Sequence, residues 1–232
     1  MILSNLIKIS VFTHTVAGFI GLLFFWILIF KKKGTKSHQK IGQIFYYSLI
    51  IVCSTSILNG TVYLIADVFF EQNIKPHLGY SVVMILQGLL SMIPAYYGQL
   101  ALRSINIEPS QKTIQLHLKF MLFLCFFVLV NQIYSVFLNY YLLIFYSFTA
   151  APLAIFLCYM LLRKVKCQIS SRKELLTSHI ILSIFSGIAL HVGFFVGGFS
   201  TKFLKRFPSN TEYAGIILGM SLACVVYVEV LR

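Results

Sequence analysis

The sequence predicts an all-α polytopic membrane protein, a bundle of seven transmembrane helices, and two observations carry that prediction. The first is composition: 59% of the 232 residues are hydrophobic and the mean hydropathy is +0.87, whereas soluble domains hold about 45–50% apolar residues. The second is that the apolar residues come in blocks of about 20, the length that crosses a hydrocarbon layer of about 30 Å as a helix. Because backbone amides in lipid must bond within their own segment, each block is expected to be helical.

Seven such blocks follow one another, and the polar breaks between them are too short for a second domain. We therefore predict one transmembrane domain over residues 1–232. The basic cluster follows the first block and no small-residue cleavage site is present, so the first helix is expected to remain as an anchor. The expected spans are residues 7–30, 41–66, 78–102, 114–138, 141–162, 175–199 and 213–231.

Basic residues indicate how the chain is threaded. The formal net charge is +13, and fourteen of the nineteen lysines and arginines fall on one side of the expected membrane. Because Lys and Arg in short loops stay in the cytoplasm, we expect the N-terminus outside and the C-terminus inside a bacterial inner membrane. The inner side would then contact anionic lipid headgroups. No aromatic and basic platform accompanies the charge, so a nucleic-acid partner is not expected.

Six histidines fall into two layers of the expected bundle. The outer layer holds His14, His77 and His191, and the inner layer holds His38, His117 and His179. Imidazoles in two layers on different helices are what a transmembrane cytochrome needs, because paired histidines hold a haem b iron.

Both deeper histidines, His14 and His191, stand four residues from a glycine, Gly18 and Gly187, and are expected beside glycine-lined grooves. For the three inner histidines a simple headgroup contact stays open as the alternative, because each begins a helix at the basic surface.

Polar stripes on several expected spans support a different hypothesis. Amide and hydroxyl side chains recur there at helical spacing, and such groups can line a path for a small solute or a proton. Packing alone also accounts for such stripes, because small residues let helices approach and amides bond between them. The residues expected to line a path are Asn59, Tyr63, Gln87, Asn131 and His191.

Complete catalytic motifs are missing from the sequence. It contains no nucleophile elbow, no phosphate-binding loop and no pair of carboxylates, so hydrolase and kinase chemistry lacks its parts. It also contains no pair of histidines at the spacing of a zinc site. An enzymatic role is therefore not favoured, and no metal site apart from a haem is expected.

One string of motifs resembles a known family. In chain order the string is His14-Thr-Val-Ala-Gly18, Lys33-Gly34, His38-Gln-Lys-Ile-Gly42, Tyr97-Gly98-Gln-Leu-Ala101-Leu-Arg103 and His117-Leu-Lys-Phe-Met121. It resembles the prokaryotic predicted-membrane-protein family "domain of unknown function 2306" over residues 1–140. The family pattern often has Arg and Trp after the third histidine, where Leu118-Lys119-Phe120 stands here, and residues 141–232 lie outside the resemblance. The resemblance implies a membrane fold, singles out His14, His38 and His117, and implies no activity.

The leading functional hypothesis is a redox-associated membrane protein that binds haem b or a quinone through helix-borne histidines. In this hypothesis His14 and His191 serve an outer site, and His38, His117 and His179 are the candidates for an inner site. Two alternatives stay open. One is a small-solute or proton-coupled transporter in which a histidine carries the proton. The other is a non-catalytic assembly protein whose polar stripes only pack helices.

Overall fold

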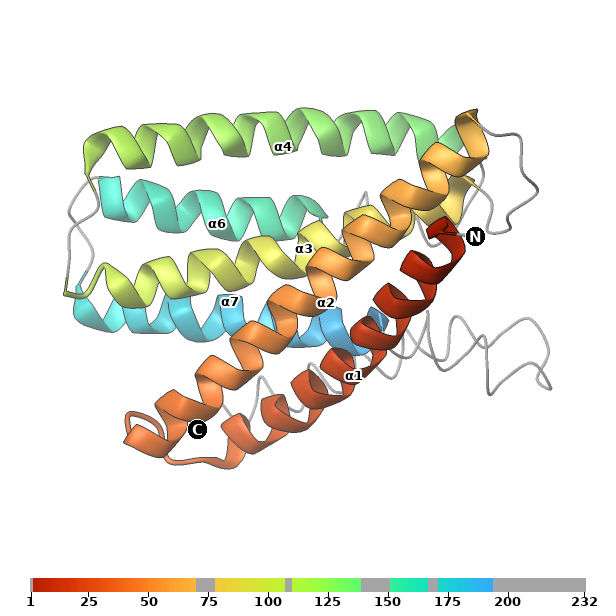
Figure 1. Ribbon diagram of the computed structural model, residues 1–232. Coiled ribbons are helices and arrows are strands. Elements are labelled where there is room, and N and C mark those ends of the chain that lie inside the picture. Colours follow the sequence, from red (N-terminus) through yellow and green to blue (C-terminus); the bar gives the residue numbers. More distant parts are fainter. Residues whose placement is uncertain (1, 70–77, 107–109, 139–150, 167–170, 194–232) are drawn as a thin grey trace. The chain divides into compact units, whose positions relative to one another are not determined.

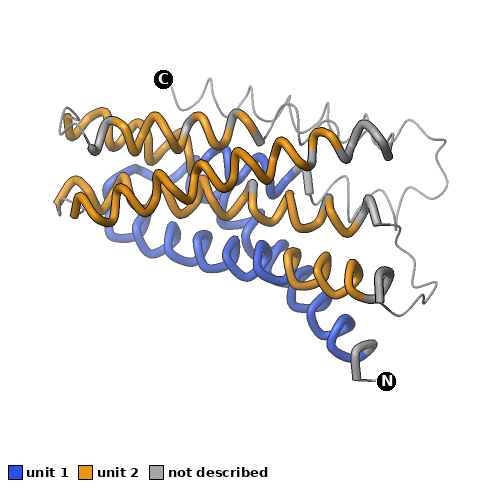
Figure 2. The backbone as a smooth tube through the Cα atoms, turned by 90° about the horizontal axis from the view of Figure 1, so that it is seen from above, with its two compact units in different colours: residues 1–55, 184–232 blue, residues 56–183 orange. Residues whose placement is uncertain are grey.

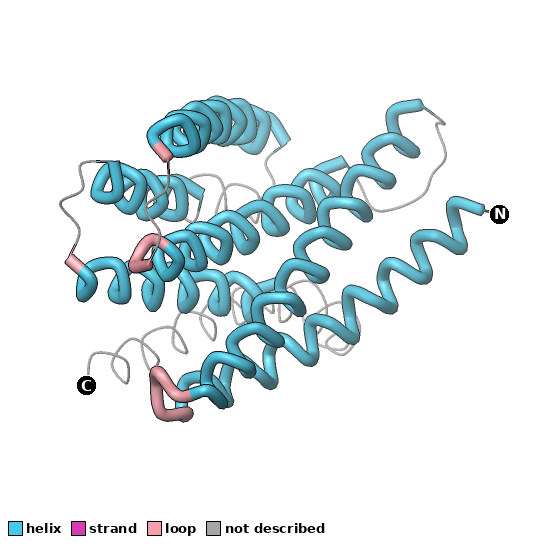
Figure 3. Tube along the Cα trace, turned by 60° about the vertical axis from the view of Figure 1, so that its left-hand side comes forward, coloured by secondary structure: helices cyan, strands magenta, loops and turns pink. Residues whose placement is uncertain are grey.

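Helices make up nearly all of the described protein in the computed structural model (Figure 1). The structure describes residues 2–69, 78–106, 110–138, 151–166 and 171–193. Within these ranges only helices, turns and loops occur and no strand is present (Figure 3), so the predicted all-α class is confirmed. The helices are α1 (Ile2–Phe30), α2 (Lys36–Phe69), α3 (Leu78–Arg103), α4 (Gln111–Leu138), α6 (Ala151–Lys166) and α7 (Arg172–Gly193).

Four of the described helices are long and apolar enough to cross a membrane, judged by length and composition. Their apolar stretches are Asn5–Phe30, Lys36–Ile65, Gln111–Val130 and Arg172–His191. A shorter apolar helix covers Ala154–Arg163. These stretches agree with a membrane protein and overlap five of the expected spans. The expected span 213–231 and the segments 141–150 and 194–199 lie outside the described residues.

The surface of α4 shows what such a helix presents to its surroundings. Leu122 is 71% exposed and Phe126 is 64% exposed, and other large apolar side chains of α4 are exposed with them. A contiguous apolar surface of this kind is unfavourable in water and marks an interaction surface. In a bilayer it needs no further partner, because lipid tails are as apolar as leucine.

Residues at the helix ends explain why the helices begin and end where they do. Gly34 adopts a φ of 81°, a left-handed conformation that suits glycine in the turn between α1 and α2. The Thr35 hydroxyl accepts a hydrogen bond from the His38 backbone N–H at 3.2 Å, which caps α2. Ser171 and Glu174 form a capping box: the Ser171 N–H donates to the Glu174 carboxylate at 2.9 Å, and the Glu174 N–H donates to the Ser171 hydroxyl at 3.3 Å.

The described residues form two compact units (Figure 2). Unit 1 contains α1, α2 up to Thr55 and α7 from Ile184 onward. Unit 2 contains the remainder of α2 and α7 together with α3, α4 and α6.

The core of unit 2 lies among α3, α4, α6 and α7. Helix α6 packs against both α3 and α4. The apolar side chains buried between these helices form a close-packed centre, which fixes the register of the helices. The buried core residues are Ile93, Tyr97, Ala101, Ile114, Met121, Leu124, Cys158, Leu161, Leu162, Leu175 and Leu182.

Candidate functional site

The most unusual polar group in unit 1 is the imidazole of His191, which is only 5% exposed. Its Nδ1 lies 2.7 Å from the carbonyl oxygen of Gly187, one turn earlier in α7. A carbonyl oxygen can only accept, so Nδ1 carries the ring proton and Nε2 of the neutral imidazole holds a lone pair. That Nε2 is buried and has no hydrogen-bond partner in the described part of the chain.

Aromatic rings surround this imidazole within unit 1. The ring centroid of Phe25 lies 5.1 Å from that of His191, and the centroid of Trp26 lies 5.7 Å from it, both in edge-to-face geometry. Phe25 also contacts Phe45 of α2 at a centroid distance of 5.7 Å. The Phe25 ring occupies the space that a side chain at Gly187 would fill. The glycine expected to line a groove beside His191 is therefore the residue that admits Phe25.

His14 has a different environment in the same unit, because it joins α1 to α2. Its Nδ1 lies 3.1 Å from the Val52 carbonyl oxygen and 3.0 Å from the Thr55 hydroxyl oxygen. The Thr55 hydroxyl donates its own proton to the Ile51 carbonyl at 2.8 Å. The His14 Nδ1–H therefore donates toward both oxygens, and Nε2 again holds the lone pair. A side chain at Gly18 would meet only Val52, at an ordinary 3.8 Å.

The two deeper histidines have different neighbours among the described residues. Every hydrogen bond described for the His14 ring goes to α2, whereas the ring of His191 contacts α1 and its own helix. Along α1, His14 precedes Phe25 by eleven residues, a rise of about 16 Å. This difference in depth favours separate roles for the two imidazoles.

A cluster of three rings forms in unit 2 where α3 meets α4. The hydroxyl oxygen of Tyr97 lies 3.2 Å from His117 Nδ1, and that of Tyr96 lies 3.5 Å from His117 Nε2. The ring centroids are 5.3 Å apart for the two tyrosines and 5.6 and 5.5 Å from the imidazole to Tyr96 and Tyr97. The imidazole is half-buried, and each of its ring nitrogens faces one tyrosine hydroxyl.

His179 contacts the next residue along the same stretch of α3. Its Nδ1 donates to the Gly98 carbonyl oxygen at 2.9 Å. A side chain at Gly98 would lie 3.4 Å from the His179 carbonyl oxygen and from Leu182, so glycine allows α7 to approach here. The structure therefore brings His117 and His179, two of the three inner-layer histidines, to one level of α3.

The remaining inner-layer histidine, His38, lies in unit 1 in the first turn of α2. It is half-buried, and its backbone N–H is held by the Thr35 cap. His77 of the outer layer lies outside the described residues.

Of the residues expected to line a transport path, Asn59, Tyr63 and Gln87 fall in unit 2, whereas His191 falls in unit 1. Asn59 is 1% exposed, and its Oδ1 has no partner among the described residues. Tyr63 and Gln87 are half-buried on α2 and α3, and the side chain of Asn131 lies outside the described part of the structure. Ser81 was not among the expected residues, but it is fully buried and its hydroxyl likewise lacks a partner in the described ranges.

Sequence reasoning missed the groups that surround the histidines. Phe25, Trp26 and Tyr96 were not predicted as site residues, although Trp26 is the sole tryptophan and Tyr96 adjoins the Tyr97-Gly98 motif. Aromatic residues on a span facing a histidine are the signal that could have found them. Within the described ranges no group of three or more His, Cys, Asp or Glu residues is placed to hold a metal ion. A comparison with protein-family models, curated proteins and solved structures found no match for the chain.

Proposed function

We propose that the protein is a redox-associated, multi-pass membrane protein that binds haem b or a quinone through helix-borne histidines. The observation that supports this proposal best is the buried, unbonded Nε2 of His191. Burying a polar group without a hydrogen bond costs about 1–3 kcal/mol in proteins. A ligand for that lone pair would remove the cost.

The hydrogen bonding of His191 suits an imidazole that would hold a haem iron through Nε2. Metal-ligating histidines commonly donate their other ring N–H to a backbone carbonyl, which fixes the tautomer and the ring orientation. The Gly187 carbonyl does this for His191. A haem bound there would supply one-electron transfer, and the apolar rings around the site would set its dielectric surroundings.

The chain's own groups have distinct roles in this proposal. The Gly187 carbonyl orients the imidazole, while Phe25 and Trp26 exclude water from Nε2. His14 is the expected partner of His191 in an outer site, but its bonds to Val52 and Thr55 favour a role in joining α1 to α2. We assign the ligand role to His191.

The membrane setting is part of the same proposal. We propose seven spans with the N-terminus outside and the C-terminus inside a bacterial inner membrane, because fourteen of the nineteen basic residues then face the cytoplasm and anionic headgroups. We also propose membership of the family "domain of unknown function 2306", on the strength of the motif string at residues 1–140.

Absorption spectra of the purified protein test the redox proposal. The protein is purified in mild detergent from haem-replete cells, and spectra are recorded after oxidation and after dithionite reduction. We expect a Soret band with α and β bands on reduction, lost in His191→Ala and kept in the control Thr15→Ala, which changes an exposed residue of the same unit. A colourless wild-type protein would refute haem binding.

A proton-coupled or small-solute transporter is the second candidate, and the buried groups of unit 2 favour it specifically. Asn59 Oδ1 of α2 and Ser81 Oγ of α3 have no hydrogen-bond partner among the described residues. Polar groups without a hydrogen bond are costly to bury, and a solute or water passing between the helices would satisfy them. Flux in proteoliposomes that Asn59→Leu abolishes would support this candidate, and flux unchanged by that substitution would exclude this path.

A further inference from the structure

Two side-chain oxygens on facing helices of unit 2 are fully buried and unbonded. Asn59 of α2 is 1% exposed and Ser81 of α3 is 0% exposed. Neither Asn59 Oδ1 nor Ser81 Oγ has a hydrogen-bond partner among the described residues. A buried polar atom without a partner is costly, and lipid supplies none. Each oxygen is therefore expected to bind a small polar molecule.

Contacts on either side place these two oxygens at one level of the α2–α3 contact. Ser56 Oγ donates to the Met84 carbonyl oxygen at 2.8 Å, and a Cβ at Gly60 would lie 2.6 Å from the Ser81 carbonyl oxygen. Residue numbers therefore rise along α2 as they fall along α3, which is an antiparallel pairing. Asn59 comes three residues after Ser56, and Ser81 comes three before Met84. Both lie about one helical turn further along the same contact.

Ser56 adds a third oxygen to this level. It is 7% exposed, and its single O–H is taken by the Met84 carbonyl. A serine hydroxyl has two lone pairs besides its donor, so Ser56 Oγ can still accept. Asn59 follows Ser56 by three residues, which places both on one side of α2. We call Ser56, Asn59 and Ser81 the polar layer.

The hydrogen-bonding capacity of the polar layer matches one water molecule. Asn59 Oδ1 and Ser56 Oγ are acceptors, and the Ser81 hydroxyl is a donor without an acceptor among the described residues. A water molecule can donate to the two acceptors and accept from the Ser81 O–H. Buried waters in proteins typically make about three hydrogen bonds of this kind.

We propose that the polar layer binds one internal water, which joins α2 to α3. Ser81 is the fourth residue of α3, which begins at Leu78, so the layer lies about 4.5 Å along the axis from the start of that helix. Water at the membrane surface is therefore about one helical turn away, and the bound molecule is expected to exchange with it.

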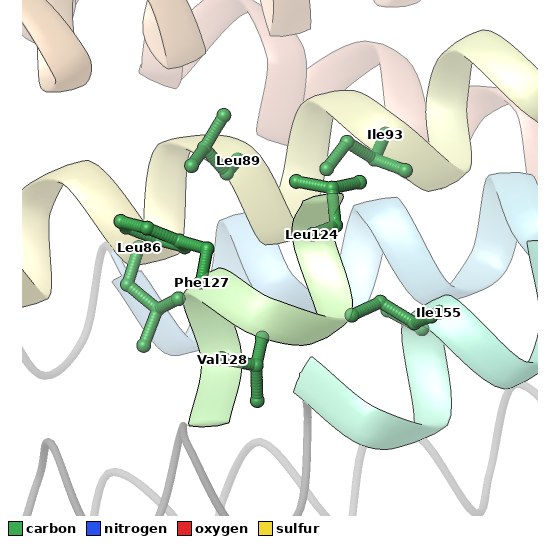
Figure 4. A pocket seen from close by; sticks show the side chains of 8 residues that line it. Leu86, Leu89, Ile93, Leu124, Phe127, Val128 and Ile155 are labelled. Atoms are coloured by element: carbon green, nitrogen blue, oxygen red, sulfur yellow. The ribbon is translucent and has the colours of Figure 1, made fainter. Parts of the chain in front are cut away.

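Size alone does not make an internal space a water site. A void among α3, α4 and α6, close to one water molecule in volume, is lined only by apolar side chains (Figure 4). Apolar cavities stay dry, because a water needs two to four polar partners. The lining residues are Leu86, Leu89, Ile93, Leu124, Phe127, Val128, Ala154 and Ile155.

An alkali cation and a direct bond between Asn59 and Ser81 are the competing explanations. The three oxygens of the polar layer carry no formal charge, and an ion buried without a counter-charge is costly. A direct bond would satisfy Asn59 Oδ1 and Ser81 Oγ, but neither atom has a partner in the described part of the chain. Both observations favour a neutral bridging molecule.

Radiolytic hydroxyl labelling tests the proposal, because an X-ray pulse makes bound water oxidise the side chains next to it. Ile85 is the reporter, since its side chain lies 2.7 Å from the position of a Cβ at Gly60. The purified protein is mixed rapidly with ¹⁸O-water before the pulse. We expect Ile85 to be labelled and to take up ¹⁸O more slowly than Leu102, which is 37% exposed next to the end of α3.

Three substitutions make the test specific. Asn59→Leu removes an acceptor and occupies the space, so labelling of Ile85 should be lost. Ser81→Ala removes one of three hydrogen bonds, so ¹⁸O should reach Ile85 about tenfold faster. Thr61→Ala is the matched control and should behave as the wild type, because Thr61 lies on another face of α2 and bonds the Ile57 carbonyl of its own helix at 2.8 Å. Circular dichroism and size-exclusion chromatography establish that the variants fold.

Three outcomes would overturn the inference. An unlabelled Ile85 in the wild type would favour a direct bond, and equal labelling in Asn59→Leu and the wild type would place the water elsewhere. A detergent unfolding midpoint that rises in sodium or potassium chloride over choline chloride, at equal ionic strength, would indicate a cation.

The proposed water goes beyond both candidate functions, because it requires neither haem nor transport. A labelled Ile85 in a protein whose flux does not depend on Asn59 would refute the transport candidate alone. Flux that depends on Asn59 in a protein with an unlabelled Ile85 would refute this inference alone.

Discussion

Gly60→Ala is the sharpest test of how α2 meets α3 within unit 2. A Cβ at Gly60 would lie 2.6 Å from the Ser81 carbonyl oxygen, 2.7 Å from a side-chain carbon of Ile85 and 3.2 Å from the Ile85 backbone nitrogen. Two of these three neighbours are backbone atoms, which cannot rotate away as a side chain can. Alanine at this position must therefore move one helix relative to the other.

The size of the effect follows from those distances. Ordinary contact begins at 3.4 Å, so the 2.6 Å contact must open by 0.8 Å. A gap of that size forfeits a quarter to a half of the dispersion energy of the atoms along it, and overpacking of this kind costs about 1–3 kcal/mol. Alanine regains up to about 1 kcal/mol through its better helix propensity. We expect Gly60→Ala to lower the free energy of unfolding by about 1–2 kcal/mol.

Unfolding by sodium dodecyl sulfate in mixed micelles, followed by circular dichroism, measures this change. Gly18→Ala is the matched control, because a Cβ at Gly18 meets only Val52 at 3.8 Å. The control should be neutral or stabilising by up to about 1 kcal/mol, since propensity improves and nothing must move. If Gly60→Ala proved as stable as Gly18→Ala, the close approach of α2 and α3 at Gly60 would be wrong.

Two further substitutions test other parts of the structure. Gly187→Ala should displace the Phe25 ring from beside His191 and lower the free energy of unfolding by about 1–3 kcal/mol. It should also weaken haem retention, measured as haem lost on washing, while leaving His191 in place. Unchanged haem retention would argue against the Phe25 contact. Ser171→Ala removes the cap of α7 and should cost about 1 kcal/mol in the same unfolding assay, whereas no loss of stability would contradict the capping box.

The helical elements were predictable because hydrophobic length is a strong signal. The expected spans 7–30 and 114–138 fall within α1 and α4. The four helices long enough to cross a membrane are recognised by the same length and apolar composition. The bounds differ mainly at helix starts. The structure begins α2 at Lys36, five residues before the expected span, because the Thr35 cap forms in the polar region that hydropathy does not register.

The surroundings of the candidate site were less predictable, because they depend on the axial register of two packed helices, which sets the residues that lie opposite one another. The sequence places Gly187 four residues before His191, but it does not say that Phe25 fills the space beside that glycine. The pairing of Tyr96 and Tyr97 with His117 also depends on the register of α3 against α4. A pattern along one helix specifies a face, and only the packing of two helices specifies the partners on it.

The hydrogen-bond partners that set the tautomers of the histidines were also mostly beyond prediction from one helix alone. Four of the five histidines proposed as ligands have ring hydrogen bonds described within the structure, and in three of them Nδ1 faces a backbone carbonyl. Those carbonyls lie on the neighbouring helix for His14 and His179, and on its own helix for His191. Only the last of these could have been anticipated from spacing, because residues four apart lie on one face of a helix.

The haem content of matched variants decides whether His191 ligates a haem. Wild type, His191→Ala and His14→Ala are purified from haem-replete cells, and haem per protein is quantified as the pyridine haemochrome. We expect haem in the wild type and in His14→Ala, and none in His191→Ala. Equal haem content in the wild type and His191→Ala, or none in any of the three, would contradict it.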